Sequence, residues 1–175
     1  TGTNLGSISG SIGTSTGTAG ITINGTGTLV LSGNNTYNGT TTLTAGTLSV
    51  SDVTNLGNAA APLTFGGGTL MVTGTTMNTL GSRTVTYGTT PTINIADAAG
   101  NLTLPTTPAL ASGTLNKNGP GTLTMGAATN IVTQLNVTGV IDLGDTELQV
   151  NNGGSTTIRT VNGSGTINAS GTGKI

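Results

Sequence analysis

The sequence predicts an all-β protein whose backbone winds as a parallel β-helix, a β-solenoid of about seven or eight coils. Three observations predict this fold: short apolar alternations along the chain, clusters of Gly and Asn between them, and a loose repeat of about twenty residues. We expect the 175 residues to form a single β-solenoid domain, a fragment or stacking subunit of a longer rod.

The strands are predicted from apolar residues that lie two apart with Thr, Ser or Asn between them, the period of a half-buried strand. Helix signals are nearly absent, because Gly, Asn or Pro interrupts the few runs of helix-favouring residues. The residues expected to face inward are, in chain order, Ile21, Ile23, Leu29, Leu31, Leu43, Ala45, Leu48, Val50, Leu63, Phe65, Leu70, Val72, Val85, Tyr87, Ile93, Ile95, Leu102, Leu104, Leu115, Leu123, Met125, Leu135, Val137, Ile141, Leu143, Leu148, Val150, Ile158 and Ile167.

The corners are predicted from Gly and Asn, which tolerate positive φ, and the runs Gly66–Gly68 and Gly119–Gly121 are two of them. Neither run is followed by the Lys-Ser/Thr of a phosphate-binding loop. An antiparallel sandwich or barrel is the alternative fold, but its turns usually come every 8–12 residues without a longer period. The period of about twenty residues suits a coil that returns about 4.8 Å further along the axis.

The composition narrows the classes of function. Charged residues make up 5% of the chain, aromatic residues 2% and hydrophobic residues 33%, which favours a folded chain with a thin, elongated core. A net charge of −1 with four basic residues cannot form the positive face that nucleic acid requires. No apolar run reaches the roughly 20 residues of a transmembrane helix, and no cysteine is present.

Candidate sites for chemistry are few, and we expect no enzymatic activity and no cofactor. The chain has no His, so the usual general base and commonest metal ligand are missing. Three acids cluster in the stretch "IDLGDTEL", namely Asp142, Asp145 and Glu147. Clustered carboxylates suit calcium or sugar chemistry, so a carbohydrate-binding or polysaccharide-cleaving β-helix is the alternative function. A solvated edge that discourages lateral aggregation explains the same acids.

Ice binding is a further function to weigh, since rows of outward Thr on a flat solenoid face can order water. The pairs that begin at Thr26, Thr40, Thr84 and Thr122 do not recur once per coil, so we expect them to be out of register. Thr is also simply a good exposed strand residue. The three aromatic residues are expected to fill the core or corners.

The stretch "ITINGTGTLVLSGNNTYNGTTTLTAGTLSVS", residues 21–51, resembles the autotransporter-associated β-strand repeat of passenger domains from type V secretion. The run "GTLNKNGPGTLTMG", residues 113–126, resembles the opening of a second copy without its Asn-Thr-Tyr half. The segment "LGNAAAPLTFGGGTLMVTG" resembles what usually follows the repeat. After residue 130 the chain resembles the repeat only in its general composition and not in these motifs.

The resemblance implies a right-handed parallel β-helix that is exported across the outer membrane of a Gram-negative bacterium and displayed or released at the cell surface. The expected function is therefore that of a structural rod: a spacer, coat, fibre or adhesin. The expected partners are the chain itself, end to end or edge to edge, the rest of a longer solenoid, and a host or surface glycan.

Overall fold

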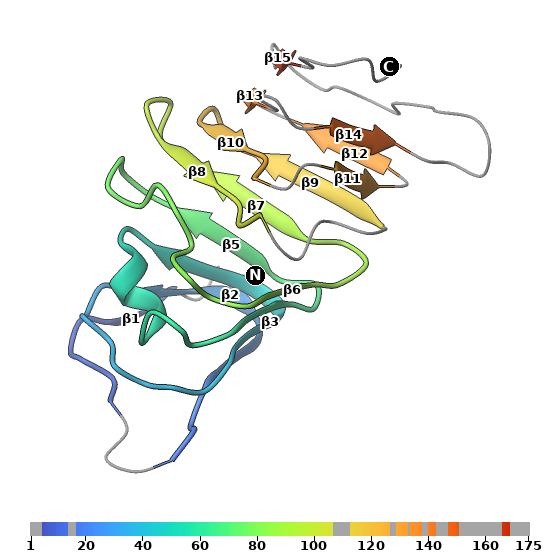
Figure 1. Cartoon of the computed structure of the whole chain (residues 1–175). Coiled ribbons are helices and arrows are strands. Elements are labelled where there is room, and N and C mark those ends of the chain that lie inside the picture. Colours follow the sequence, from blue (N-terminus) through green and yellow to red (C-terminus); the bar gives the residue numbers. More distant parts are fainter. Residues whose placement is uncertain are drawn as a thin grey trace.

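The computed structural model describes residues 5–13, 17–106, 113–126, 129–132, 134–137, 140–142, 147–150 and 166–168. Within these residues the chain forms fifteen strands and one 3-10 helix, η1 (Val53–Leu56). Every pairing between the strands is parallel, and each joins segments far apart in the sequence. Figure 1 shows the strands rising in chain order as a stack, which is the arrangement of a β-solenoid. The predicted fold class is confirmed, and the antiparallel alternative is wrong.

The largest sheet follows the order β1-β2-β3-β5-β7-β9-β12, with β4 and β6 continuing from the first half of β3. Strands β2 and β3 are long because each bends across a corner and joins two walls of the coil, with irregular register between Ile23 and Thr28. The bounds are β1 (Leu5–Ile8), β2 (Ile21–Leu31), β3 (Thr41–Val50), β4 (Leu63–Phe65), β5 (Thr69–Val72), β6 (Val85–Tyr87), β7 (Thr92–Ile95), β9 (Thr114–Asn118) and β12 (Gln134–Val137).

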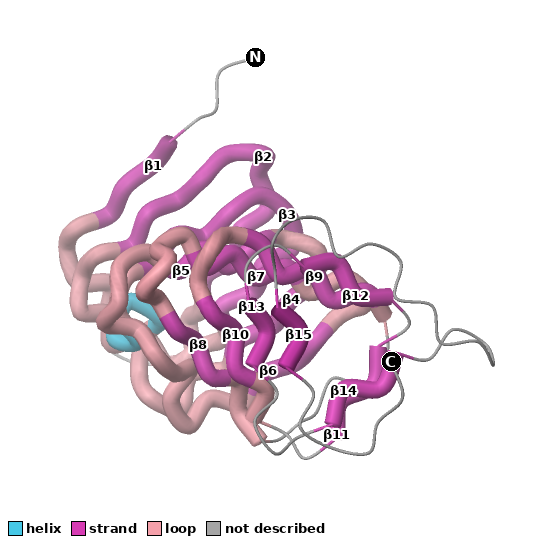
Figure 2. Tube along the Cα trace, turned by 90° about the horizontal axis from the view of Figure 1, so that it is seen from above, coloured by secondary structure: helices cyan, strands magenta, loops and turns pink. Residues whose placement is uncertain are grey.

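Two smaller sheets complete the winding. The first has the order β15-β13-β10-β8 and the second pairs β11 with β14. Seen from above, the strands of successive coils lie one behind another around a shared interior (Figure 2). The bounds are β8 (Asn101–Thr103), β10 (Thr122–Thr124), β11 (Thr129–Val132), β13 (Val140–Asp142), β14 (Glu147–Val150) and β15 (Thr166–Asn168).

The solenoid makes about five turns, slightly fewer than the seven or eight expected. The coil is longer and less regular than the period of about twenty residues. Side-chain hydrogen bonds between neighbouring coils join residues 20, 22, 23 and 24 positions apart. The extra length lies in the corners, one of which contains η1. Corner insertions are tolerated because the strands alone set the stacking of one coil on the next.

The core is a set of apolar columns, since inward residues of successive coils lie over one another. One column runs through Leu48, Leu70 and Ile93 in direct register. Phe65 of β4 and Tyr87 of β6 are likewise aligned, and their rings stack with centroids 5.8 Å apart at 17°. Burying such side chains contributes roughly 1.5–3 kcal/mol each, and this repeats along the rod.

The predicted inward residues agree closely with the observed core. Of those whose side chains are described, most are buried, while Ile21, Leu29 and Tyr87 pack against the core in half-buried positions. Ala45 is also half-buried. The expected positions that lie outside the described side chains are Leu143, Leu148, Val150, Ile158 and Ile167.

The Thr pairs do not recur once per coil, as expected, but single Thr residues of successive coils do stack in register. Thr22, Thr42, Thr64 and Thr86 pair in sequence and form a single outward column. The pairs at Thr40 and Thr84 therefore belong to the same wall, two coils apart. The spacing hid this register because the coils differ in length.

Candidate functional site

The predicted acidic cluster lies outside the side chains that the structure describes. Asp145 lies outside the described residues, and the side chains of Asp142 and Glu147 are not described. Their backbones are in different sheets, with Asp142 ending β13 and Glu147 beginning β14. The described residues contain no group of three His, Cys, Asp or Glu that could hold a metal ion. Nor do they contain a helix long and apolar enough to cross a membrane.

The polar groups that the described structure does bring together lie inside the corners. Asn35 and Asn55, from consecutive coils, are both buried. Asn35 Oδ1 accepts a hydrogen bond from the backbone N–H of Ile12 at 2.8 Å, and Asn35 Nδ2 donates to the carbonyl oxygen of Asn55 at 2.6 Å. Asn55 Nδ2 in turn donates to the carbonyl oxygen of Gly33 at 3.0 Å. These amides tie three successive coils together at one corner.

The Asn55 side chain also begins η1. Its Oδ1 accepts hydrogen bonds from the backbone N–H groups of Ser51 and Asp52 at 3.0 and 2.9 Å. Asp52 is the N-cap of η1, and its carboxylate accepts from the backbone N–H and the hydroxyl of Thr54. These hydrogen bonds lower the pKa of Asp52, the backbone N–H contributing most. Asp52 therefore has a local structural role at this corner.

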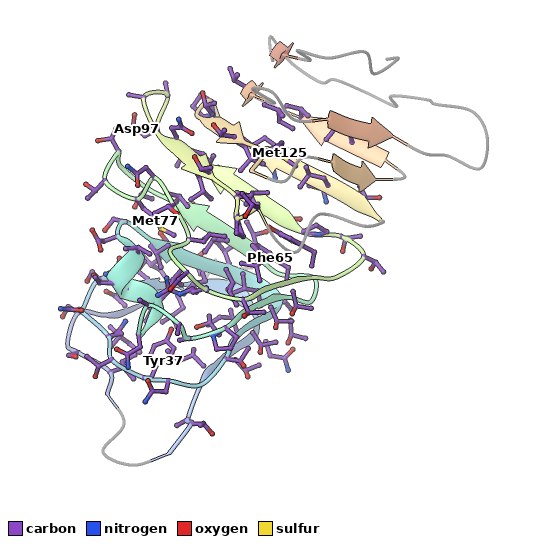
Figure 3. The ribbon with its side chains drawn as sticks, viewed as in Figure 1. Tyr37, Phe65, Met77, Asp97 and Met125 are labelled. Atoms are coloured by element: carbon purple, nitrogen blue, oxygen red, sulfur yellow. The ribbon has the colours of Figure 1, made fainter. Side chains whose placement is uncertain are left out.

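Tyr37 fills the corner beside this asparagine pair (Figure 3), and its ring is almost completely buried. Its hydroxyl forms a hydrogen bond of 2.7 Å with the Thr41 hydroxyl. Gly57 of the next coil has φ +81°, and a Cβ there would lie 2.7 Å from both Tyr37 Cε2 and the Tyr37 carbonyl oxygen. Glycine is therefore required at residue 57 by the backbone conformation and by the ring. Burial raises the pKa of Tyr37, which keeps the phenol neutral.

Arg83 occupies the corner of the following coil and is only 3% exposed. Its guanidinium donates to the carbonyl oxygens of Leu80, Gly57 and Val53 at 2.8, 2.9 and 3.0 Å, and to that of Asn58 at 3.2 Å. The Nε atom is buried without a hydrogen-bond partner. Burial lowers the pKa of Arg83, yet a guanidinium stays charged in proteins. It satisfies the carbonyls that surround the end of η1.

Lys117 of β9 is fully buried, with 0% of its surface exposed. Its ammonium donates to the carbonyl oxygens of Asn118 and Gly119 at 2.9 and 2.8 Å, within the Asn-Gly-Pro-Gly corner. Burial lowers the pKa of Lys117 to about 8. In register it lies between Ile93 and Val137, so an ammonium group continues an apolar column.

Both basic residues of the described part, Arg83 and Lys117, thus point inward and bind backbone carbonyls. The acids Asp52 and Asp97 are at least partly exposed, and Asp97 accepts a hydrogen bond from the Ala99 N–H on an outer turn (Figure 3). The outer surface of the described coils therefore carries neutral and acidic side chains. Such a surface does not attract phosphate groups.

Sequence reasoning left out these buried polar residues, although the alternation contained a signal for them. Lys117 lies two positions after the inward Leu115, and Arg83 lies two before the inward Val85. Both therefore have inward parity. Composition rules place Lys and Arg at the surface, and those rules are overridden here.

Two segments of the chain match the family model of the passenger-associated-transport-repeat, residues 21–50 and residues 115–133. The resemblance to an autotransporter passenger repeat is confirmed. The first match spans β2, β3 and the corner that holds Asn35 and Tyr37, and the second includes most of β9 and all of β10. No curated protein and no solved structure matches the chain.

Proposed function

From these two matches we propose that the chain is a structural segment of an exported passenger, a stiff rod that spaces or carries other parts of a surface protein. The repeat and the parallel solenoid both support a passenger-like extracellular domain. Outside a Gram-negative cell such a rod needs neither a cofactor nor a bound metal to hold its shape. Its role is mechanical and not enzymatic.

One observation carries this proposal: four buried polar side chains bind backbone groups of the rod. Asn35, Asn55, Arg83 and Lys117 all bind main-chain atoms at the corners. A site for chemistry instead aims polar groups into a cleft where a substrate can reach them. The side-chain hydrogen bonds at these corners therefore hold one coil on the next.

The rod's partners follow from the same construction. Each coil offers its backbone N–H and C=O groups to the next coil, so further coils of a longer solenoid or an end-to-end copy are the partners we propose. A host or surface glycan is a second partner, since the Thr and Asn side chains of the outer walls offer hydroxyl and amide groups.

The test is a deletion that removes one coil and preserves the register. Thr47 pairs with Thr69, so deleting residues 47–68 joins two equivalent points of the winding. The gene is expressed in a Gram-negative host with an epitope tag on the N-terminal side of the chain. We expect the shortened protein to reach the surface and to remain as resistant to protease as the parent.

The matched control deletes residues 47–57, half a coil, and should abolish both surface display and protease resistance. Purified parent protein is also applied to a glycan array and to a panel of polysaccharides. Cleavage of any polysaccharide, or equal surface display of both deletions, contradicts the structural role. Saturable glycan binding without cleavage assigns the rod to adhesion instead of spacing.

A further inference from the structure

Asn-Gly pairs recur along this chain, and three of them lie in the described coils. They are Asn24-Gly25, Asn38-Gly39 and Asn118-Gly119. In such a pair the glycine nitrogen can attack the asparagine carboxamide, because no Cβ shields that nitrogen. The reaction needs a glycine N–H that no acceptor holds, an exposed carboxamide, and free rotation about the asparagine Cα–C bond. The three pairs differ in these requirements.

The pair Asn38-Gly39 is held by neighbouring coils. The Gly39 N–H donates to the carbonyl oxygen of Ala19 at 3.0 Å, and Gly39 is buried. The carboxamide is held too, since Asn38 Oδ1 accepts a hydrogen bond from Asn58 Nδ2. Attack at this pair requires both hydrogen bonds to break, so the folded coil protects it.

The pair Asn24-Gly25 is held by a strand. Both residues lie inside β2, and Asn24 is in register with Ala45 of β3. Rotation about the Asn24 Cα–C bond would turn the strand in its middle and break the pairing on one side. The folded coil therefore protects this pair as well.

The pair Asn118-Gly119 has neither restraint. Asn118 is the last residue of β9 and its side chain is exposed, whereas Gly119 begins the corner. In the described part of the chain the Gly119 N–H has no hydrogen-bond acceptor, and Asn94 Oδ1, which lies beside Gly119, is itself buried without a partner. The Asn118 carbonyl oxygen accepts from the buried Lys117 ammonium at 2.9 Å. A trans peptide points its N–H away from its carbonyl oxygen, so this N–H faces away from the buried ammonium.

We propose that Asn118-Gly119 is a site of spontaneous covalent modification in the folded rod. The Gly119 nitrogen loses its proton to water and forms a bond to Asn118 Cγ, and the Cγ–Nδ2 bond breaks with release of ammonia, which takes up a proton. The product is a cyclic succinimide. Water then opens the ring at one of its two carbonyls, which leaves aspartate or isoaspartate at residue 118. No oxidant, metal or cofactor is needed.

The modification alters the coil at a defined point. A carboxylate replaces a neutral amide on a surface with few charges. Isoaspartate also lengthens the main chain where Asn118 is in register with Asn94 of the coil below. An aged rod therefore differs from a new one in charge and in backbone at this corner.

The test follows the reaction site by site in the full chain. Folded protein and urea-unfolded protein are incubated at neutral pH, and peptide mass spectrometry gives the rate at each pair. Dividing the two rates removes the effect of neighbouring residues in the sequence. We expect folding to slow the reaction at Asn38 at least about tenfold more than at Asn118, since attack at Asn38 must break two hydrogen bonds. Equal slowing at both, or greater slowing at Asn118, overturns the proposal.

Two matched variants assign the product. N118Q lengthens an exposed side chain by one methylene and disfavours ring closure, and N38Q makes the same change at the protected pair. Labelling by an isoaspartate methyltransferase should find isoaspartate at residue 118 in the folded parent and in N38Q, and none there in N118Q. Circular dichroism checks that both variants fold. Aspartate without isoaspartate at residue 118 of the parent would exclude the succinimide and overturn the proposal.

Discussion

At two kinds of corner in this solenoid, different side chains form hydrogen bonds with backbone groups that no strand pairs. In the first, at Asn35 and Asn55, neutral amides bind the backbone groups that no strand can pair. In the later coils, the cations of Arg83 and Lys117 bind the equivalent kind of carbonyl. An amide donates and accepts, so it can link the coil above to the coil below. A cation only donates, and it carries the cost of a buried charge.

The two kinds of corner differ in where they lie relative to the matched repeats. Asn35 lies within the first match to the passenger-associated-transport-repeat, and Asn55 lies just after it. The hydrogen bonds of both side-chain amides are to neutral backbone groups. Lys117 belongs to the second, partial repeat, whose sequence lacks the Asn-Thr-Tyr half.

The largest effect is expected at Arg83. In R83M the carbonyl oxygens of Leu80, Val53 and Gly57 lose the guanidinium donor, whereas that of Asn58 keeps the Ala61 N–H. Among the described residues no other cation binds this corner. Loss of one partner from a buried charged network costs about 3–5 kcal/mol in the free energy of unfolding. Urea denaturation followed by circular dichroism measures this. R83K restores one point charge and should recover only part of the loss, and equal stability of R83M and the parent would refute the assigned role.

A substitution at the asparagine corner should lower the free energy of unfolding slightly less than R83M does. N55A removes the acceptor for the Ser51 and Asp52 N–H groups and the donor for the Gly33 carbonyl. We expect a loss of about 3 kcal/mol, since leaving buried groups unpaired costs about 1–3 kcal/mol each and water partly reaches this end of η1. Asn58, exposed on the same corner, supplies the control N58A. Comparable losses for the two variants would show that burial of Asn55 is unimportant.

G57A should lower the free energy of unfolding by about 2 kcal/mol, because the added Cβ combines an unfavourable φ with overlap on the Tyr37 ring. A double-mutant cycle with Y37A separates the two causes. The penalty of G57A should fall, but not vanish, in the Y37A background, since the Tyr37 carbonyl also lies 2.7 Å from the added Cβ. Full additivity would remove the ring from the explanation.

The last prediction concerns Lys117, whose effect depends on pH. Burial lowers the folded-state pKa of Lys117 to about 8, whereas the unfolded side chain titrates near 10.5, so the parent should gain stability as the pH rises between these values. K117M removes the titrating group and should show no such gain. Chemical denaturation of both proteins across that range measures the free energy of unfolding of each. A difference between the two proteins that stays constant from pH 8 to 10.5 would contradict the lowered pKa.

The strands and core could be predicted because alternation is local: Leu70 and Val72 face inward whatever the rest of the coil does. The packing at the corners could not be predicted, because it depends on which residues of different coils come into contact. Gly57 lies over Tyr37 only when the coil between them has its observed length. The same dependence concealed the column of Thr42, Thr64 and Thr86. Variable corner lengths therefore limit what the sequence predicts about any surface of this rod.

The central claim is that each wall of the coil stacks in the parallel register described, and disulfide trapping tests it most directly because the chain has no cysteine of its own. Thr64 and Thr86 are direct neighbours in β4 and β6. Parallel neighbours lie about 4.8 Å apart, within the Cα separation of about 4.4–6.8 Å that a disulfide requires. Thr42 and Thr86 are two coils apart. Oxidation should therefore crosslink T64C/T86C rapidly within one chain and leave T42C/T86C reduced. Rapid crosslinking of T42C/T86C, with none in T64C/T86C, would contradict the solenoid.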